Sequence, residues 1–206
     1  MSRASRTAVT RDATLLAGLA LTALLAPAPA LAIDPPELLA EQLAIDPASN
    51  TGVGDAIGQE FAQGFEVARA GYLGHVLLPL NCLTWPTPTL HVTVQALDKF
   101  DRPDGRVLAS QTLPGHVMDA YPARPNPPGL RMVMFRRPPL LRPGRYAFTV
   151  SASGGMCQLW YGPPGNPYAG GDTWLSTRPG AAPGQPADWN VVMARDLAFQ
   201  LFLQPL

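Results

Sequence analysis

The chain has 206 residues and carries 15 Lys and Arg against 15 Asp and Glu, a formal net charge of zero. A nucleic-acid binder that depends on electrostatics needs a basic surplus, so this balance excludes that class. Charged residues make up only 15% of the chain, below the roughly one quarter that is usual, which excludes a disordered polyelectrolyte. The 24 Pro and 19 Gly are typical of short strands joined by many turns.

The N-terminal residues predict a secretory signal peptide. Arginines at positions 3, 6 and 11 form a positive region, residues 13–25 are an apolar run, and a small-x-small triplet follows at 30–32. This order predicts residues 1–32 as the signal peptide, with cleavage after Ala32. The alternative is an uncleaved membrane anchor, but the apolar run is shorter than the roughly 20 residues that span a bilayer. We therefore expect an exported protein, periplasmic or extracellular.

The mature chain is expected to form one domain. Removing residues 1–32, which hold three Arg and one Asp, leaves 174 residues with 12 basic and 14 acidic side chains. That length fits a single domain with a sizeable core, and we expect no membrane span in it. Residues 33–56 are predicted to be a leader with a short helix at 36–43, since a proline suits the first helical turn. Residues 57–206 are predicted to be the domain.

Short apolar runs separated by turn residues follow the leader. In residues 90–97, two valines alternate with His91, Thr93 and Gln95, which is the period of a half-buried strand. About eight such runs with turn signals between them predict an antiparallel β-sandwich. The predicted strands lie within residues 57–67, 72–80, 90–97, 107–113, 130–135, 145–151, 156–161 and 196–203.

The two cysteines, Cys82 and Cys157, both lie in the predicted mature chain. An even pair of cysteines in an exported chain most often forms a disulfide. This one would close a loop of about 75 residues, worth roughly 4 kcal/mol in the chain-entropy model. We expect the bridge to join the two sheets, and the Pro-rich loops, such as 121–128, to cross between them. The alternative is a pair of buried free thiols.

Several short motifs follow one another along the chain. They are Gly58-Gln59-Glu60-Phe61, residues 74–80, 92–97, 98–110 and 138–153, the turn 166–171, and Asp196-Leu197-Ala198-Phe199. In this order they resemble a bacterial extracellular module that is appended to secreted enzymes, adhesins and surface proteins. The resemblance covers most of residues 57–204. It implies an all-β, antiparallel β-sandwich of the jelly-roll type, with a role in binding or spacing rather than in catalysis.

Aromatic side chains gather after residue 160 among Gly and Pro. Aromatic rings pack on the C–H faces of sugars, while Asp, Asn or backbone groups bind the hydroxyls. The alternative is packing in the core, which we favour for Trp160 because it lies close to Cys157. The predicted carbohydrate-binding residues are Asn166, Tyr168, Asp172, Trp174 and Trp189.

The sequence predicts no metal site and no cofactor. Three histidines lie on three different elements without the spacing of a zinc motif. Asp98, Asp101 and Asp104 lie at intervals of three residues around Pro103, whereas an EF-hand alternates its ligands and closes with Glu. We predict that residues 98–105 are a hairpin turn made by the Pro-Asp-Gly sequence, and structural calcium is the alternative. The histidines are His75, His91 and His116.

No catalytic motif stands out either. No serine lies in a Gly-x-Ser-x-Gly elbow, although a triad could be assembled from separate strands. Four carboxylates could in principle pair for glycoside hydrolysis, but we expect them to be solvated strand ends. They are Glu60, Glu66, Asp172 and Asp188.

We therefore expect a secreted, non-catalytic module that binds a carbohydrate or a surface polymer. One alternative is a structural or protein-interaction module of the cell envelope or extracellular matrix, whose apolar strand 196–203 could pair with the edge of an envelope-protein partner. Another is a small secreted hydrolase with a site assembled from distant residues. No nucleic-acid partner is expected.

Overall fold

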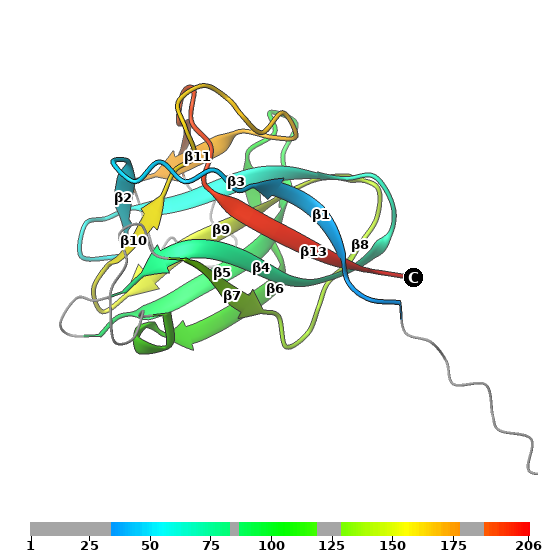
Figure 1. The fold of residues 1–206 in the computed structure, drawn as a ribbon, viewed down its shortest axis with the longest axis horizontal. Coiled ribbons are helices and arrows are strands. Elements are labelled where there is room, and N and C mark those ends of the chain that lie inside the picture. Colours follow the sequence, from blue (N-terminus) through cyan, green and yellow to red (C-terminus); the bar gives the residue numbers. More distant parts are fainter. Residues whose placement is uncertain (1–33, 83–86, 119–128, 178–187) are drawn as a thin grey trace, which may run out of the picture. The chain divides into compact units, whose positions relative to one another are not determined.

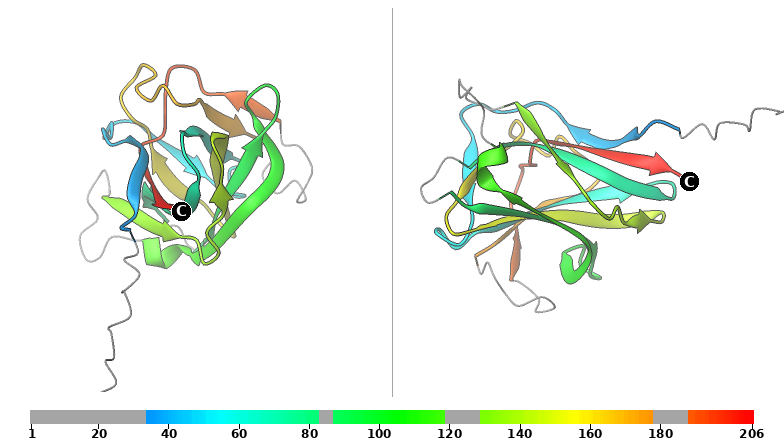
Figure 2. Two further views of the ribbon diagram at one scale, coloured as in Figure 1. Left: turned by 90° about the vertical axis from the view of Figure 1, so that its right-hand side faces the viewer. Right: turned by 90° about the horizontal axis from the view of Figure 1, so that it is seen from below.

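Two antiparallel sheets stacked face to face make up the fold (Figure 1). The computed structural model describes residues 34–82, 87–118, 129–177 and 188–206. The right-hand view of Figure 2 shows the two sheets edge-on as separate layers. The predicted antiparallel β-sandwich is confirmed, and each of the runs predicted as strands contains one.

The first sheet has seven strands. They are β1 (Glu37–Gln42), β2 (Asn50–Val53), β4 (Gly71–Asn81), β7 (Leu130–Met134), β8 (Leu140–Leu141), β10 (Cys157–Trp160) and β13 (Phe199–Pro205). Their order is β1-β13-β4-β10-β2, and β7 and β8 also pair with β4. Because β13 lies between β1 and β4, the prediction that residues 196–203 offer a free edge to a partner is wrong.

The second sheet has six strands. The order is β12 (Trp189–Val191), β11 (Thr173–Ser176), β3 (Glu60–Val67), β9 (Gly144–Ser153), β5 (Thr89–Leu97) and β6 (Pro103–Pro114). A short 3-10 helix, η1 (Gly115–Met118), follows β6, the last of them in this order. Within the two sheets, β1-β13-β4-β7 faces β3-β9-β5-β6. If these eight strands alone are renumbered from 1 to 8 in chain order, the two sheets read 1-8-3-6 and 2-7-4-5. This is the strand order of a jelly roll.

Aromatic rings fill the space between the sheets. Phe148 on β9 meets Phe199 on β13 edge-on, with ring centroids 5.4 Å apart. Phe61 on β3 meets Tyr161, which follows β10, at 6.1 Å. The three phenylalanines are almost fully buried. Burial of each ring contributes roughly 1.5–3 kcal/mol, so these contacts across the layers hold the sandwich closed.

The predicted leader is part of the sheet. Residues 36–43 were expected to be helical, but they form β1, which pairs with β13 from Glu37 opposite Leu203 to Gln42 opposite Phe199. Helix propensity is a weak preference, and pairing with a long buried strand outweighs it. Since β2 also pairs with β10, residues 37–42 and 50–53 belong to the sandwich rather than to a leader.

The predicted disulfide between Cys82 and Cys157 is confirmed. The prediction that it joins the two sheets is wrong, because Cys82 follows β4, Cys157 begins β10, and these strands are neighbours in one sheet. The chain does pass between the sheets in the connection from β6 to β7, which contains residues 121–128. Those residues, the predicted signal peptide 1–32 and nearly all of the loop 177–186 lie outside the described ranges. No helix in the described part is long and apolar enough to cross a membrane.

Replacing both cysteines with alanine is expected to lower the free energy of unfolding by about 2–5 kcal/mol. The disulfide closes a loop with a sequence separation of 75 residues, so its loss frees much of the unfolded chain. Equilibrium urea unfolding measures the change. Dithiothreitol should lower the free energy of unfolding of the wild type and leave that of the double variant unchanged. Equal stability of the wild type and the double variant without dithiothreitol would contradict the prediction.

Candidate functional site

The outward side of the six-stranded sheet, which we call the polar face, carries a row of aligned side chains. Residues directly opposite one another on successive strands point to the same side of a sheet. The row crosses five strands, from β11 through β3, β9 and β5 to β6, and neighbouring strands lie about 4.8 Å apart, so it spans about 19 Å. In order, its members are Trp174, Ala62, Thr149, Thr93 and Ser110.

Hydrogen bonds fix the polar groups of this row. The hydroxyls of Thr93 and Thr149 are 2.8 Å apart, and the Gln95 amide donates to Thr93 Oγ1 at 3.1 Å. Burial raises the pKa of the neighbouring Glu60 carboxyl, and a hydrogen bond from Thr149 opposes that shift. Glu60 is therefore half-buried on the sheet, and the prediction of a solvated strand end does not describe it.

A second row brings a histidine beside two hydroxyls. His91 Nε2 lies 2.8 Å from Ser153 Oγ, and His91 Nδ1 lies 3.2 Å from Thr112 Oγ1. Ser153 and His91 thus have the contact of a nucleophile and its base. The second ring nitrogen faces a hydroxyl, however, and a hydroxyl stabilises an imidazolium far less than the carboxylate of a catalytic triad. The arrangement suits ligand binding better than acyl transfer.

Three of the predicted sugar-binding residues lie on the polar face. Trp174 and Trp189 pack with Ala62 and Ala147, and only 8% and 7% of the two tryptophans is exposed. Asp172 is exposed and lies two residues before Trp174, on the same side of the chain. The tryptophans thus offer little exposed ring surface at the end of the row.

The other two predicted residues, Asn166 and Tyr168, converge instead on a carboxylate. The Tyr168 backbone N–H donates to Asp196 Oδ2 at 2.9 Å, and the Asn166 amide donates to the same oxygen at 2.9 Å. The Tyr168 ring packs edge-on against Phe199 with centroids 5.1 Å apart. The structure therefore divides the predicted cluster into a polar-face group and a group that anchors the loop before β11.

Asp196 is fully buried and joins this loop to the six-stranded sheet. The amide of Gln63, on β3, donates to Asp196 Oδ1 at 3.3 Å and to the carbonyl of Gly171 at 3.1 Å. A Cβ at position 171 would lie 2.5 Å from the carbonyl carbon of Gly64, so only glycine fits there. Burial raises the pKa of Asp196, while the bonds from Tyr168 and Gln63 oppose the shift.

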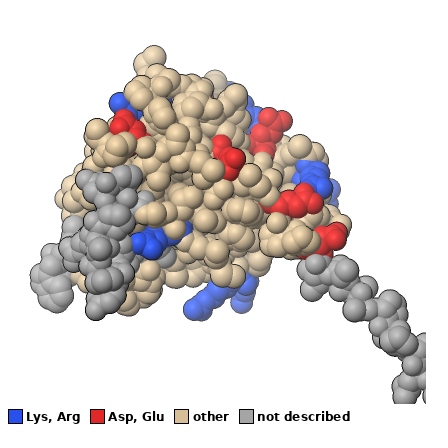
Figure 3. All heavy atoms as spheres, in the orientation of Figure 1, with Lys and Arg blue, Asp and Glu red and all other residues tan. Residues whose placement is uncertain are grey.

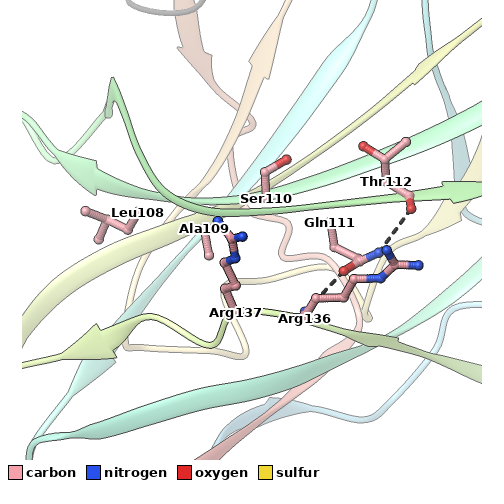
Figure 4. A pocket seen from close by; sticks show the side chains of 7 residues that line it. All are labelled: Leu108, Ala109, Ser110, Gln111, Thr112, Arg136 and Arg137. Atoms are coloured by element: carbon pink, nitrogen blue, oxygen red, sulfur yellow. Dashed lines mark hydrogen bonds between the residues drawn. The ribbon is translucent and has the colours of Figure 1, made fainter.

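A pocket of about 540 Å³ lies at the far end of the row, where β6 is the edge of its sheet. Its lining includes Ser110, Thr112, Arg136 and Arg137. In Figure 4 the arginine side chains extend toward β6 from one side, and the side chains of Ser110 and Thr112 project from the other side of that strand. Gln111 ties the two sides together, because its Oε1 accepts the Arg136 N–H at 3.2 Å and its Nε2 donates to the Thr112 carbonyl at 3.0 Å.

No protein-family model matches this chain, and no curated protein matches it either. The function is therefore inferred from the geometry of these sites.

The acidic segment 98–105 is a hairpin turn between β5 and β6, as predicted. The turn is stabilised by Asp98 and not by the predicted Pro-Asp-Gly sequence. Asp98 Oδ1 accepts hydrogen bonds from the backbone N–H groups of Phe100 at 2.8 Å and Arg102 at 3.0 Å. Pro103 already belongs to β6. The described residues contain no group of three or more His, Cys, Asp or Glu that could hold a metal ion. Each of the three carboxylates of this segment forms an ion pair with an arginine. The pairs are Asp98–Arg102, Asp101–Arg145 and Asp104–Arg106.

Glu60 and Glu66 are not arranged as a glycosidase pair. Glu60 and Glu66 lie on the same side of β3 but six residues apart, which separates them by about 20 Å. Glycosidase carboxyl groups lie roughly 5–10 Å apart. Asp172 and Asp188 are both exposed.

Sequence reasoning did not identify the arginine pocket or the polar row as a site. The signal for the row was present, since His91, Thr93 and Gln95 alternate with apolar residues and must share one side of a strand. The pocket had no local signal, because Ser110 and Arg136 lie on different sheets and are brought together only by the fold.

Asp196→Asn is expected to lower the free energy of unfolding by about 1–3 kcal/mol at neutral pH, because the new amide turns an N–H toward buried donors. A raised pKa means that the folded state holds the proton more tightly than the unfolded state. The contribution of Asp196 to stability therefore falls as pH rises from the ordinary value of 3.8 through the raised pKa. Urea unfolding of both proteins should show a wild-type advantage that shrinks over this range.

The matched control is Asp172→Asn, which changes an exposed carboxylate of the loop beside Asp196. The Asp172 carboxylate helps to raise the pKa of Asp196 but accepts no buried hydrogen bond from the described residues, so this variant should change stability far less than Asp196→Asn. A wild-type advantage over Asp196→Asn that grows as pH rises would show that the fold favours the ionised carboxylate, contrary to this prediction.

Proposed function

We propose that this protein is an exported, non-catalytic module that binds a polysaccharide or a similar surface polymer along the polar face. The observation that carries the proposal is the row from Trp174 to Ser110, in which the hydroxyls of Thr149, Thr93 and Ser110 are aligned across three adjacent strands. An extended sugar chain presents hydroxyls at regular intervals and needs a long, flat series of donors and acceptors.

The chemistry of the row supports this ligand class. Hydroxyls of Thr93 and Ser110, the imidazole of His91 and the Glu60 carboxyl can each exchange hydrogen bonds with sugar hydroxyls. The small exposed part of Trp174 and Trp189 at the β11 end supplies apolar contact beside the exposed carboxylate of Asp172. Mutual hydrogen bonds already hold several of these groups, so binding would cost little side-chain entropy.

Export is supported by two further observations. The N-terminal residues have the order of a signal peptide, and the disulfide fits an oxidising compartment. The motif order resembles the bacterial extracellular module described above. In that setting, whether in the periplasm or outside the cell, a binding module would hold a polymer or attach its carrier to one.

The test is isothermal titration of the protein with a panel of soluble polysaccharides. The double variant His91→Ala/Ser110→Ala removes two accessible polar groups and should weaken binding by about tenfold or more, with an unchanged melting temperature. Tyr72→Ala is the matched control, because Tyr72 is 42% exposed on the seven-stranded sheet. Affinity for no polysaccharide, or affinity that Tyr72→Ala reduces and the double variant does not, would overturn the proposal.

The contact between Ser153 and His91 favours one second candidate, a serine hydrolase. A fluorophosphonate probe should then label the wild type and fail to label Ser153→Ala. If the wild type is not labelled, this candidate is excluded and the binding role is unaffected.

A further inference from the structure

Unpaired positive charge is concentrated in one segment of the described chain. Five arginines form ion pairs with carboxylates: Arg69, Arg102, Arg106, Arg145 and Arg195. Four others make no ion pair with a described residue, and all four lie between positions 131 and 142, a stretch without Asp or Glu: Arg131, Arg136, Arg137 and Arg142. In Figure 3, Lys and Arg side chains project along the lower border of the molecule, below β7 as placed in Figure 1.

Two of these arginines line the pocket at the edge of β6. Arg136 and Arg137 share it with Ser110 and Thr112, and the pocket lining contains no Asp or Glu. Figure 4 shows both arginine side chains extending from the segment after β7 toward β6. Because Gln111 bonds to the backbone of both Thr112 and Arg136, the fold holds the segment that carries the arginines beside β6.

The pocket continues the polar row. Ser110 is the last member of the row and also lines the pocket, so a chain lying along the row reaches the edge strand β6 beside which the arginines lie. We infer that the bound polymer is an acidic polysaccharide, whose carboxylate or sulfate groups bind Arg136 and Arg137 in this pocket. This inference rests on the proposed function and specifies its ligand class.

The charge chemistry favours an anion at this position. A guanidinium presents a planar fork of N–H donors that matches two oxygens of a carboxylate or sulfate. The predicted mature chain is slightly acidic, so it would repel a polyanion elsewhere, and the uncompensated arginines would direct the polymer to this edge. Neutral sugars could accept hydrogen bonds from these arginines but would gain no charge–charge attraction.

The test uses polymers that differ only in charge. Polygalacturonate is compared with its methyl ester, and dextran sulfate with dextran, so that each pair keeps one backbone. The acidic member should bind at least about tenfold more tightly at low salt, and added salt should reduce the difference. The two acidic polymers separate a preference for carboxylate from one for sulfate.

The variant Arg136→Ala/Arg137→Ala should lose that preference, binding the acidic and neutral members alike. Both side chains are exposed, so the variant should fold, and its melting temperature checks this. Arg142→Ala is the matched control, an exposed arginine of the same segment that does not line the pocket, and it should bind like the wild type.

The outcomes separate this inference from the function on which it rests. Equal binding of acidic and neutral polymers, reduced by His91→Ala/Ser110→Ala, would overturn the inference and keep the binding function. A charge preference that survives Arg136→Ala/Arg137→Ala would place the anion elsewhere and also overturn it. Binding of none of the polymers would overturn both.

Discussion

The contact between Phe148 and Phe199 across the two layers sets the side on which every neighbouring residue lies. Side chains alternate along a strand, so burying Phe148 turns Ala147 and Thr149 outward. Register with the adjacent strands then places Ala62 and Thr93 beside Thr149. The polar face is therefore the necessary reverse side of the aromatic core, and a register shift of one residue would remove both.

Buried polar groups attach a loop to the six-stranded sheet. Asp196 and Gln63 bind backbone groups of a loop that no regular strand pairing holds. Two of the motifs that resemble an extracellular module meet here, since the turn at 166–171 contacts the residue that begins the Asp-Leu-Ala-Phe motif. Asn166 and Tyr168 thus have structural contacts with Asp196 that do not depend on any ligand.

The sequence predicted the strands whose apolar and polar residues alternate over a long run, such as β5 and β9, because each buries one side. It missed β1, whose residues suit a helix equally well, and β11 and β12, which are too short to show a period. The disulfide followed from the cysteine count, but its place within one sheet depended on strand order. The arginine pocket had no sequence signal, since Gln111 and Arg136 meet only when the two sheets pack together.

The pairing of β1 with β13 has a consequence for how the module could be carried. Glu37 lies opposite Leu203, and the side chain of Gln204 donates to the carbonyl of Asp34, so both ends of the sandwich emerge side by side from the seven-stranded sheet. A tether or a neighbouring domain joined at either end would leave from the same corner. The domain could therefore be inserted into a surface loop of another protein without rethreading its strands, and its six-stranded sheet would remain exposed.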